Sequence, residues 1–306
     1  MEVLQRDVTA AELCRFAAAR AQEASRHGSA LPRASRVGAV ALDGGAFVGC
    51  ALAELYRVDG RPPRWAYLAE LFVEAPYRTR GLGRGLLSAV EGAAAQAGAR
   101  HIWTRTAEYE APGFYARHGY RVTHTLQSWY PSGHGNVVLR KPLAAAAVGT
   151  DAAPEGVEVV ARLPSDAELA RTAEGFVEHG ESFGNPPECS ERIGFVAVEG
   201  EALLGFVSGL VRHVEGAPGL WCTLTDLFVA RPARGQGVGS TLLDAMHEAL
   251  RRTGVERVET WAPGFHAIAF MHERGYETRT TLEDWYPGGV ARLALTARLR
   301  PRRRRS

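Results

Sequence analysis

The chain has 306 residues, 46% of them hydrophobic and 23% charged, with a formal net charge of +2. This length predicts two domains, and the composition is that of a globular protein rather than of a disordered or fibrous one. The near-neutral charge gives no support to nucleic-acid or membrane binding, and no apolar stretch approaches the roughly 20 residues of a membrane span. Four scattered cysteines without paired spacing argue against a disulfide framework and against a zinc site.

Apolar periodicity predicts the elements of the first half in chain order. The expected helices are an Ala-rich segment over residues 9–27, a second one through Leu86, Val90 and Ala94, and a short one around Phe114. Gly98 ends the second helix, because glycine is favoured at a left-handed cap. The expected strands share apolar runs bounded by turn residues, and they cover 37–42, 47–56, 65–73, 101–106, 120–130 and 136–139.

The second half repeats the first at a constant offset of 156 residues. Gly81-Leu82-Gly83 corresponds to Gly237-Val238-Gly239, and Trp129-Tyr130-Pro131 corresponds to Trp285-Tyr286-Pro287. The register holds without a gap, and even Glu2-Val3 has its counterpart in Glu158-Val159. A period this long indicates two whole domains rather than the short units of a solenoid.

Composition suggests where one repeat ends and the next begins. Residues 142–155 are small and low in charge, so we interpret them as a linker. The predicted organisation is therefore a domain over 1–141, this linker, a second domain over 156–299 and a basic tail over 300–306. Tails of this kind are typically solvated.

An anion-binding device stands at the same place in both repeats: an apolar strand, then Arg-x-x-Gly-x-Gly, then a helix. Glycines allow a tight turn and a close approach of a ligand to backbone N–H groups, and the positive end of the helix favours a pyrophosphate. The spacing matches neither a Walker loop nor the dinucleotide fingerprint. The alternative is a purely structural turn, which the presence of two copies makes less attractive.

The segments that carry this device resemble a known family. Leu71 to Leu87, its partner Leu227 to Leu243, and the later element Phe114-Tyr115-Ala116-Arg117-His118-Gly119-Tyr120 resemble the GCN5-related N-acetyltransferase (GNAT) superfamily, as a tandem member with two such domains. The resemblance implies an α/β (α+β) fold of two GNAT-like domains. Each would have a mixed, mostly antiparallel central sheet flanked by helices.

The resemblance also implies acetyl-CoA as the acyl donor. The loop binds the pyrophosphate in this family, and the end of the preceding strand pairs with the pantetheine arm. Carried over residue by residue, the donor site would comprise Leu71, Phe72, Val73, Arg78, Thr79, Arg80, Gly81, Leu82, Gly83 and Arg84 in the first repeat. In the second repeat it would comprise Leu227, Phe228, Val229, Gly235, Gln236, Gly237, Val238, Gly239 and Ser240.

Two residues of the first repeat are candidates for proton transfer in direct attack of an amine on the thioester. Glu70 precedes the Leu-Phe-Val stretch and is the candidate base, with Asp226 at the matched position; a solvated or salt-bridged strand residue is the alternative for both. Tyr115 matches the family's proton donor to the leaving thiolate, and a half-buried aromatic is its alternative. Met271 replaces it in the second repeat, so we expect the first repeat to be the catalyst.

The function that follows is acetyl-CoA-dependent N-acetylation of a primary amine on a small molecule or a peptide. The competing interpretation is a non-catalytic acyl-CoA-binding scaffold or sensor. A third, nucleic-acid binding through the Arg-rich tail, lacks the interleaved aromatic residues that would support it. The N-terminus lacks the layout of a signal peptide, so we expect a cytoplasmic protein without a membrane or metal partner, as a monomer or a homodimer.

Overall fold

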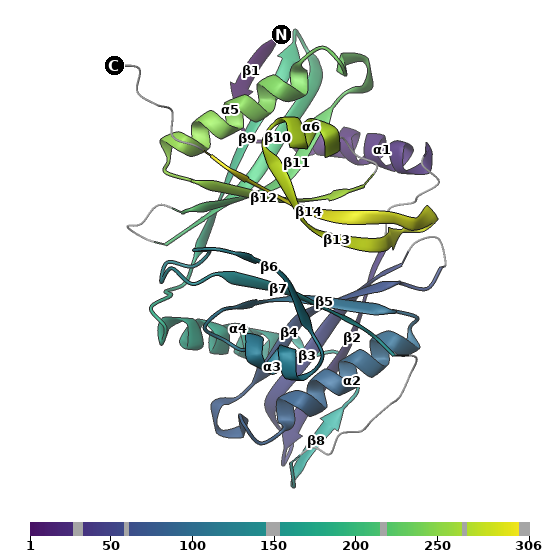
Figure 1. Ribbon diagram of the computed structural model, residues 1–306, viewed down its shortest axis with the longest axis vertical. Coiled ribbons are helices and arrows are strands. Elements are labelled where there is room, and N and C mark those ends of the chain that lie inside the picture. Colours follow the sequence, from purple (N-terminus) through teal and green to yellow (C-terminus); the bar gives the residue numbers. More distant parts are fainter. Residues whose placement is uncertain (27–32, 58–60, 145–153, 215–218, 265–267, 300–306) are drawn as a thin grey trace. The chain divides into compact units, whose positions relative to one another are not determined.

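A computed structural model describes residues 1–26, 33–57, 61–144, 154–214, 219–264 and 268–299 (Figure 1). The chain forms two compact units, one made of residues 30–187 and the other of residues 1–29 and 188–306. We call them the Tyr115 unit and the Met271 unit, after the residues at the position of the expected proton donor. Within the described residues, no helix is both long and apolar enough to cross a membrane.

The Tyr115 unit is built on a seven-stranded sheet in the order β6-β7-β5-β4-β3-β2-β8, in which only β4 and β5 run parallel. Its strands are β2 (Arg33–Asp43), β3 (Ala46–Arg57), β4 (Trp65–Val73), β5 (His101–Ala107), β6 (Arg121–Leu126), β7 (Asn136–Pro142) and β8 (Val157–Val160). Its helices are η1 (Ala75–Tyr77), α2 (Leu82–Gln96), α3 (Pro112–Arg117) and α4 (Asp166–Glu181).

The Met271 unit has the same architecture, with the strand order β1-β9-β10-β11-β12-β14-β13. Its strands are β1 (Glu2–Gln5), β9 (Cys189–Glu199), β10 (Ala202–His213), β11 (Trp221–Val229), β12 (Arg257–Pro263), β13 (Tyr276–Tyr286) and β14 (Val290–Arg298). Its helices are α1 (Ala10–Arg26), η2 (Arg231–Ala233), α5 (Val238–Arg252), α6 (Ile268–Glu273) and η3 (Pro287–Gly289).

The compact units do not coincide with the sequence repeats, because the repeats exchange their first strand and helix. Strand β1 pairs antiparallel with β9 of the second repeat, and β8 pairs antiparallel with β2 of the first. The chain passes from one unit to the other after α1 and again after α4. The repeat boundaries at 1–141 and 156–299 therefore divide each unit, and the stretch 142–155 connects β7 to β8 inside the Tyr115 unit.

Both exchanged helices begin with the same reciprocal cap. In α4, the Ser165 hydroxyl accepts a hydrogen bond from the backbone N–H of Glu168, whose carboxylate accepts from the backbone N–H of Ser165. Thr9 and Glu12 make the same pair at the start of α1. Such a capping box satisfies orphan donors of the first turn. A hydrogen bond from Arg162 holds the pKa of Glu168 down to about 2.

Helices cover both faces of the sheet in the Tyr115 unit. Helix α2 buries Leu82, Leu86 and Val90 completely against one face, which fixes the direction in which the helix leaves the preceding loop. The opposite face is covered by α4, where Phe176 packs edge-on against Phe72 with ring centroids 5.8 Å apart. Gly175 leaves room for the Phe72 ring, since a Cβ at this position would lie 2.3 Å from it.

The sequence expectations missed strands β1 and β8, and the other elements differ from them mainly at their ends. Strand β4 has the expected bounds of 65–73, whereas β2 begins four residues before the predicted start at 37. Arg298 is the last residue of β14 and pairs with Arg257, so the strand continues up to the predicted tail. Residues 300–306, the predicted basic tail, lie outside the described residues.

Candidate active site

The central feature of each unit is a pair of parallel strands that separate. Strand β4 pairs with β5 only from Trp65–His101 to Tyr67–Trp103, although both strands continue. At the point of separation, the Thr104 hydroxyl donates to the carbonyl oxygen of Leu68 at 3.0 Å. The matched hydroxyl of Thr260 donates to Leu224 at 2.9 Å in the other unit. Among the described residues, the end of β4 therefore pairs with β3 on one side and not with β5 on the other.

A β-bulge fixes which side chains of β4 face the opening. Leu52 pairs with Glu70 and Ala53 with Leu68, so Ala69 is the extra residue. The bulge shifts the alternation, so that Leu71 and Val73 join the core on the α2 face. Glu70 and Phe72 consequently take the opposite face, where the Phe72 ring is buried under α4. Because the Phe72 side chain is buried, only the backbone groups of Phe72 could contact an acyl donor.

The two glycine loops have the backbone conformation of an anion site. Gly81 precedes α2 with φ of 88° and Gly237 precedes α5 with φ of 81°, and a Cβ at either would meet open space. Gly235 takes a positive φ of 74°, and the matched Thr79 adopts φ of 63° despite its branched side chain. The N–H groups at the first turns of α2 and α5 have no acceptor one turn earlier in their own helix, which is the arrangement that binds an anion at a helix N-terminus.

Several loop residues predicted to bind the donor have mainly structural contacts. The Arg78 side chain donates from Nε to the carbonyl oxygen of Val73 at 2.9 Å, and Arg234 repeats this contact with Val229 at 3.1 Å. Leu82 is fully buried. Arg80 and Arg84 are exposed beside the loop, so the positive charge expected there is present. Gly83 faces the ring of Phe114 at the start of α2.

The loop of the Met271 unit is more extensively occupied by its own side chains. The amide of Gln236 donates to the carbonyl oxygen of Pro232 at 2.9 Å, and Val238 is buried like Leu82. The Ser240 hydroxyl accepts a short hydrogen bond from Arg274, which also contacts Asp244 at 3.2 Å. Ser240 therefore already has a donor, whereas the first loop carries arginine at the matched position 84.

Glu70 and Tyr115 lie close enough to each other in the Tyr115 unit to interact electrostatically. Burial raises the pKa of the Glu70 carboxyl, and Glu110 and Glu54 raise it further. The Tyr115 side chain is buried, and burial followed by the charge of Glu110 raises the pKa of its hydroxyl. The carboxyl group is thus suited to accept a proton, and the phenol keeps its proton at neutral pH.

Glu110 is a site residue that sequence reasoning missed. Its carboxylate accepts hydrogen bonds from the Thr106 hydroxyl at 2.8 Å and from the backbone N–H of Ala107 at 3.2 Å. It also acts electrostatically on Glu70, Tyr115 and Tyr130. No motif marks this position, because the turn after β5 carries it to the end of the strand pair.

The same positions in the Met271 unit have lost this arrangement. Asp226 accepts a hydrogen bond from the Ser208 hydroxyl at 3.0 Å, and Met271 is a buried core residue. Where Tyr67 stacks on Trp103 at 4.5 Å, the matched Thr223 donates to Glu259 at 3.1 Å. The strands still separate here, but a thioether replaces the phenol.

The comparison with protein families agrees with this geometry. The model of the "Acetyltransferase (GNAT) family" matches residues 7–120 and again residues 165–276. The chain belongs to this family. It is a tandem GNAT protein with two mixed α/β domains, an N-acetyltransferase by family, and its donor is an acyl-CoA. A search of curated proteins finds no significant match.

Three solved structures that the chain resembles each align with less than half of it. An acetyltransferase from Bacillus cereus ATCC 14579 is 20% identical over 45% of this chain and 95% of its own, with a TM-score of 0.39. Ard1 from Thermoplasma volcanium is 19% identical over 35% and 71%, with a TM-score of 0.31. An aminoglycoside 6'-N-acetyltransferase complexed with coenzyme A is 15% identical over 45% and 83%, with a TM-score of 0.31.

Proposed function

We propose that the Tyr115 unit transfers an acetyl group from acetyl-CoA to a primary amine of a small molecule or peptide. The observation that carries this proposal is the pair of Glu70 and Tyr115 at the opening between β4 and β5. The Glu70 carboxyl has a raised pKa, the Tyr115 phenol is protonated, and the two groups interact electrostatically. These are the two groups that direct aminolysis of a thioester requires.

The chain's own residues fit an acyl-CoA. The glycine loop and the first turn of α2 offer backbone N–H groups for the pyrophosphate, with Arg80 and Arg84 adding positive charge. The stretch Leu71–Val73, without a β5 partner, offers backbone groups for the pantetheine arm. A backbone N–H of this stretch would polarise the thioester carbonyl when the donor is bound, as an oxyanion donor does.

The proposed chemistry forms one bond and breaks one. The neutral amine nitrogen bonds to the acetyl carbon, and the carbon–sulfur bond breaks. Glu70 takes the proton that the amine loses, directly or through a water molecule, and Tyr115 gives its hydroxyl proton to the leaving sulfur. After the amide and the free thiol have left, Glu70 releases its proton and the Tyr115 phenolate takes one up, which restores both groups.

The test is Tyr115→Phe, which removes the hydroxyl and keeps the ring. Because general acid catalysis contributes on the order of 10² or more in rate, we expect kcat to fall about 100-fold while the KM for acetyl-CoA stays unchanged. The fold should survive, since the neighbouring Thr104 hydroxyl keeps its bond to Leu68. Free-thiol release with a panel of primary amines gives the rate.

A matched control exists in the other unit. Met271→Leu conserves volume in the core and should leave kcat unchanged. An unaltered kcat in Tyr115→Phe would remove Tyr115 from the mechanism. Saturable binding of acetyl-CoA without turnover on any amine would support the alternative function, an acyl-CoA-binding scaffold.

A further inference from the structure

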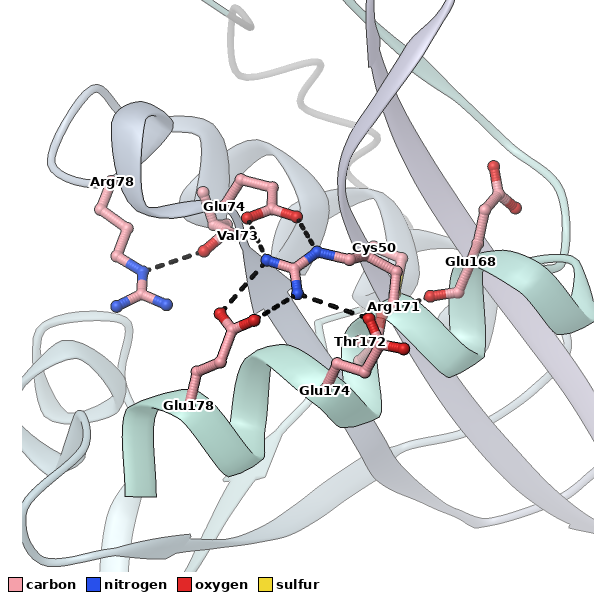
Figure 2. Close-up of polar contacts among 9 residues, drawn as sticks. All are labelled: Cys50, Val73, Glu74, Arg78, Glu168, Arg171, Thr172, Glu174 and Glu178. Atoms are coloured by element: carbon pink, nitrogen blue, oxygen red, sulfur yellow. Dashed lines mark hydrogen bonds and ion pairs between the residues drawn. The ribbon is translucent and has the colours of Figure 1, made fainter. Parts of the chain in front are cut away.

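The Tyr115 unit receives helix α4 from the second repeat, and this helix contacts the donor loop of the first. Figure 2 shows its polar face with Arg171 at the centre. The Arg171 guanidinium donates from Nε to one oxygen of Glu74 at 2.7 Å and from Nη2 to the other at 3.0 Å. Glu74 directly follows β4 and precedes the loop, so this fork holds the loop at its beginning.

Arg171 also neutralises a second carboxylate. Its Nη1 donates to Glu178 at 2.9 Å, and its Nη1 lies 3.7 Å from Glu174 (Figure 2). Glu178 interacts electrostatically with Arg78, whose Nε is bound to Val73 (Figure 2). Arg171 therefore contacts three carboxylates beside the start of the loop that, in the proposed function, accepts a pyrophosphate.

The contact between Arg171 and Glu74 is partly buried, so solvent screens it only in part. The side chain of Glu74 is 20% exposed and that of Arg171 is 34% exposed, and the guanidinium also lies 6.0 Å from the centroid of the Phe72 ring. A bidentate Arg–carboxylate contact fixes direction as well as charge. The other end of α4 reaches the turn after β5, where Phe183 stacks on Tyr109 at 5.1 Å. The helix is thus held at both ends.

The Met271 unit lacks this clamp although its helix carries the arginine. Arg15 of α1 corresponds to Arg171 at the offset of 156, but Ala230 corresponds to Glu74 and Gln22 to Glu178. The clamp is therefore specific to the unit that keeps Glu70 and Tyr115. If Arg171 only stabilised α4, it would not need Glu74 on the donor loop as a partner.

We propose that Arg171 of the second repeat is a positioning residue for the acyl-CoA loop of the first: it fixes the loop through Glu74 and cancels the negative charge beside the pyrophosphate site. This inference rests on the proposed function. It places control of donor affinity in a segment that the sequence assigns to the other repeat.

The experiment is a calorimetric titration of the full-length chain with acetyl-CoA, in a Gly239→Glu background that closes the second loop. Arg171→Met should raise the Kd about three- to tenfold, the effect of one charge-assisted bidentate contact discounted for partial exposure. Arg15→Met, the matched control, should leave the Kd unchanged. The kinetic counterpart is a rise in the KM for acetyl-CoA at constant kcat.

Two further variants separate positioning from mere support of the fold. Arg171→Lys keeps the charge and loses the fork, so it should recover part of the affinity. Arg171→Met combined with Glu74→Gln removes one uncompensated carboxylate and should bind more tightly than Arg171→Met alone. A lower unfolding temperature with an unchanged Kd in Arg171→Met would overturn the inference while leaving the proposed function intact. Failure of the wild-type chain to bind acetyl-CoA would overturn both.

Discussion

A buried histidine should make the Met271 unit sensitive to mild acid. His247 of α5 is 6% exposed, and its Nε2 lies 2.9 Å from the hydroxyl of Tyr276. Burial, with the nearby charge of Arg251, lowers the pKa of His247 from 6.5 to about 4. The unfolded chain therefore binds a proton on this residue that the folded chain does not. Stability is fully present above pH 6.5 and falls as the pH decreases towards 4.

The size of the loss follows from the two pKa values. Since one pKa unit corresponds to about 1.4 kcal/mol, the free energy of unfolding should fall by about 1.4 kcal/mol near pH 5.5 and by about 2.5 kcal/mol near pH 4.5. The measurement is urea unfolding of the wild-type chain and of His247→Gln across this range. Glutamine retains a hydrogen bond to Tyr276 but does not titrate, so the difference between the two chains isolates His247.

The carboxylates act in a different pH window. Hydrogen bonds from Arg6 hold the pKa of Glu12 at about 2. The stability that this pair contributes therefore disappears only as the pH falls from about 4.5 towards 2. The Tyr115 unit carries Glu91 in place of His247, and this carboxylate is paired with Lys141 at 2.6 Å. Parallel pH profiles of the wild-type and His247→Gln chains between pH 7 and 4.5 would refute the reasoning.

Three further predictions concern glycines. Gly83→Glu places a carboxylate at the first turn of α2 and should reduce turnover far more than Gly239→Glu in the other loop, measured by free-thiol release; equal losses would contradict catalysis by the Tyr115 unit. Gly175→Ala forces a Cβ against the buried Phe72 ring and should destabilise the chain by about 1–3 kcal/mol. Gly92→Ala, which meets open space in α2, should stabilise it by about 0.5–1 kcal/mol in the same urea titrations.

The sequence predicted the elements well but could not predict which edge each first strand would join. Glu2-Val3 and Glu158-Val159 have the same pattern, so β1 and β8 fit either sheet equally well. Pairing with β9 or with β2 depends on tertiary contacts of the attached helices, such as Phe16 against Phe206 and Thr172 against Cys50. Local periodicity contains no information on that choice.

The sequence also could not predict which face of the sheet the Glu70 side chain takes. Strict alternation along 65–73 would place Leu68 and Leu71 on opposite faces, yet both pack in the same core. The bulge at Ala69 makes this possible, and alanine gives no signal of a bulge. The loop glycines, by contrast, were predictable, because a left-handed φ before a helix strongly favours glycine.

The exchange of strands and helices changes what a break in the backbone would do. A cut within 145–153 would not release two domains, since β7 and β8 on either side of it belong to one sheet. Each fragment would contain most of one unit together with the first strand and helix of the other. The two fragments would then be complementing partners, each completing its counterpart, and neither could be produced alone with a full sheet.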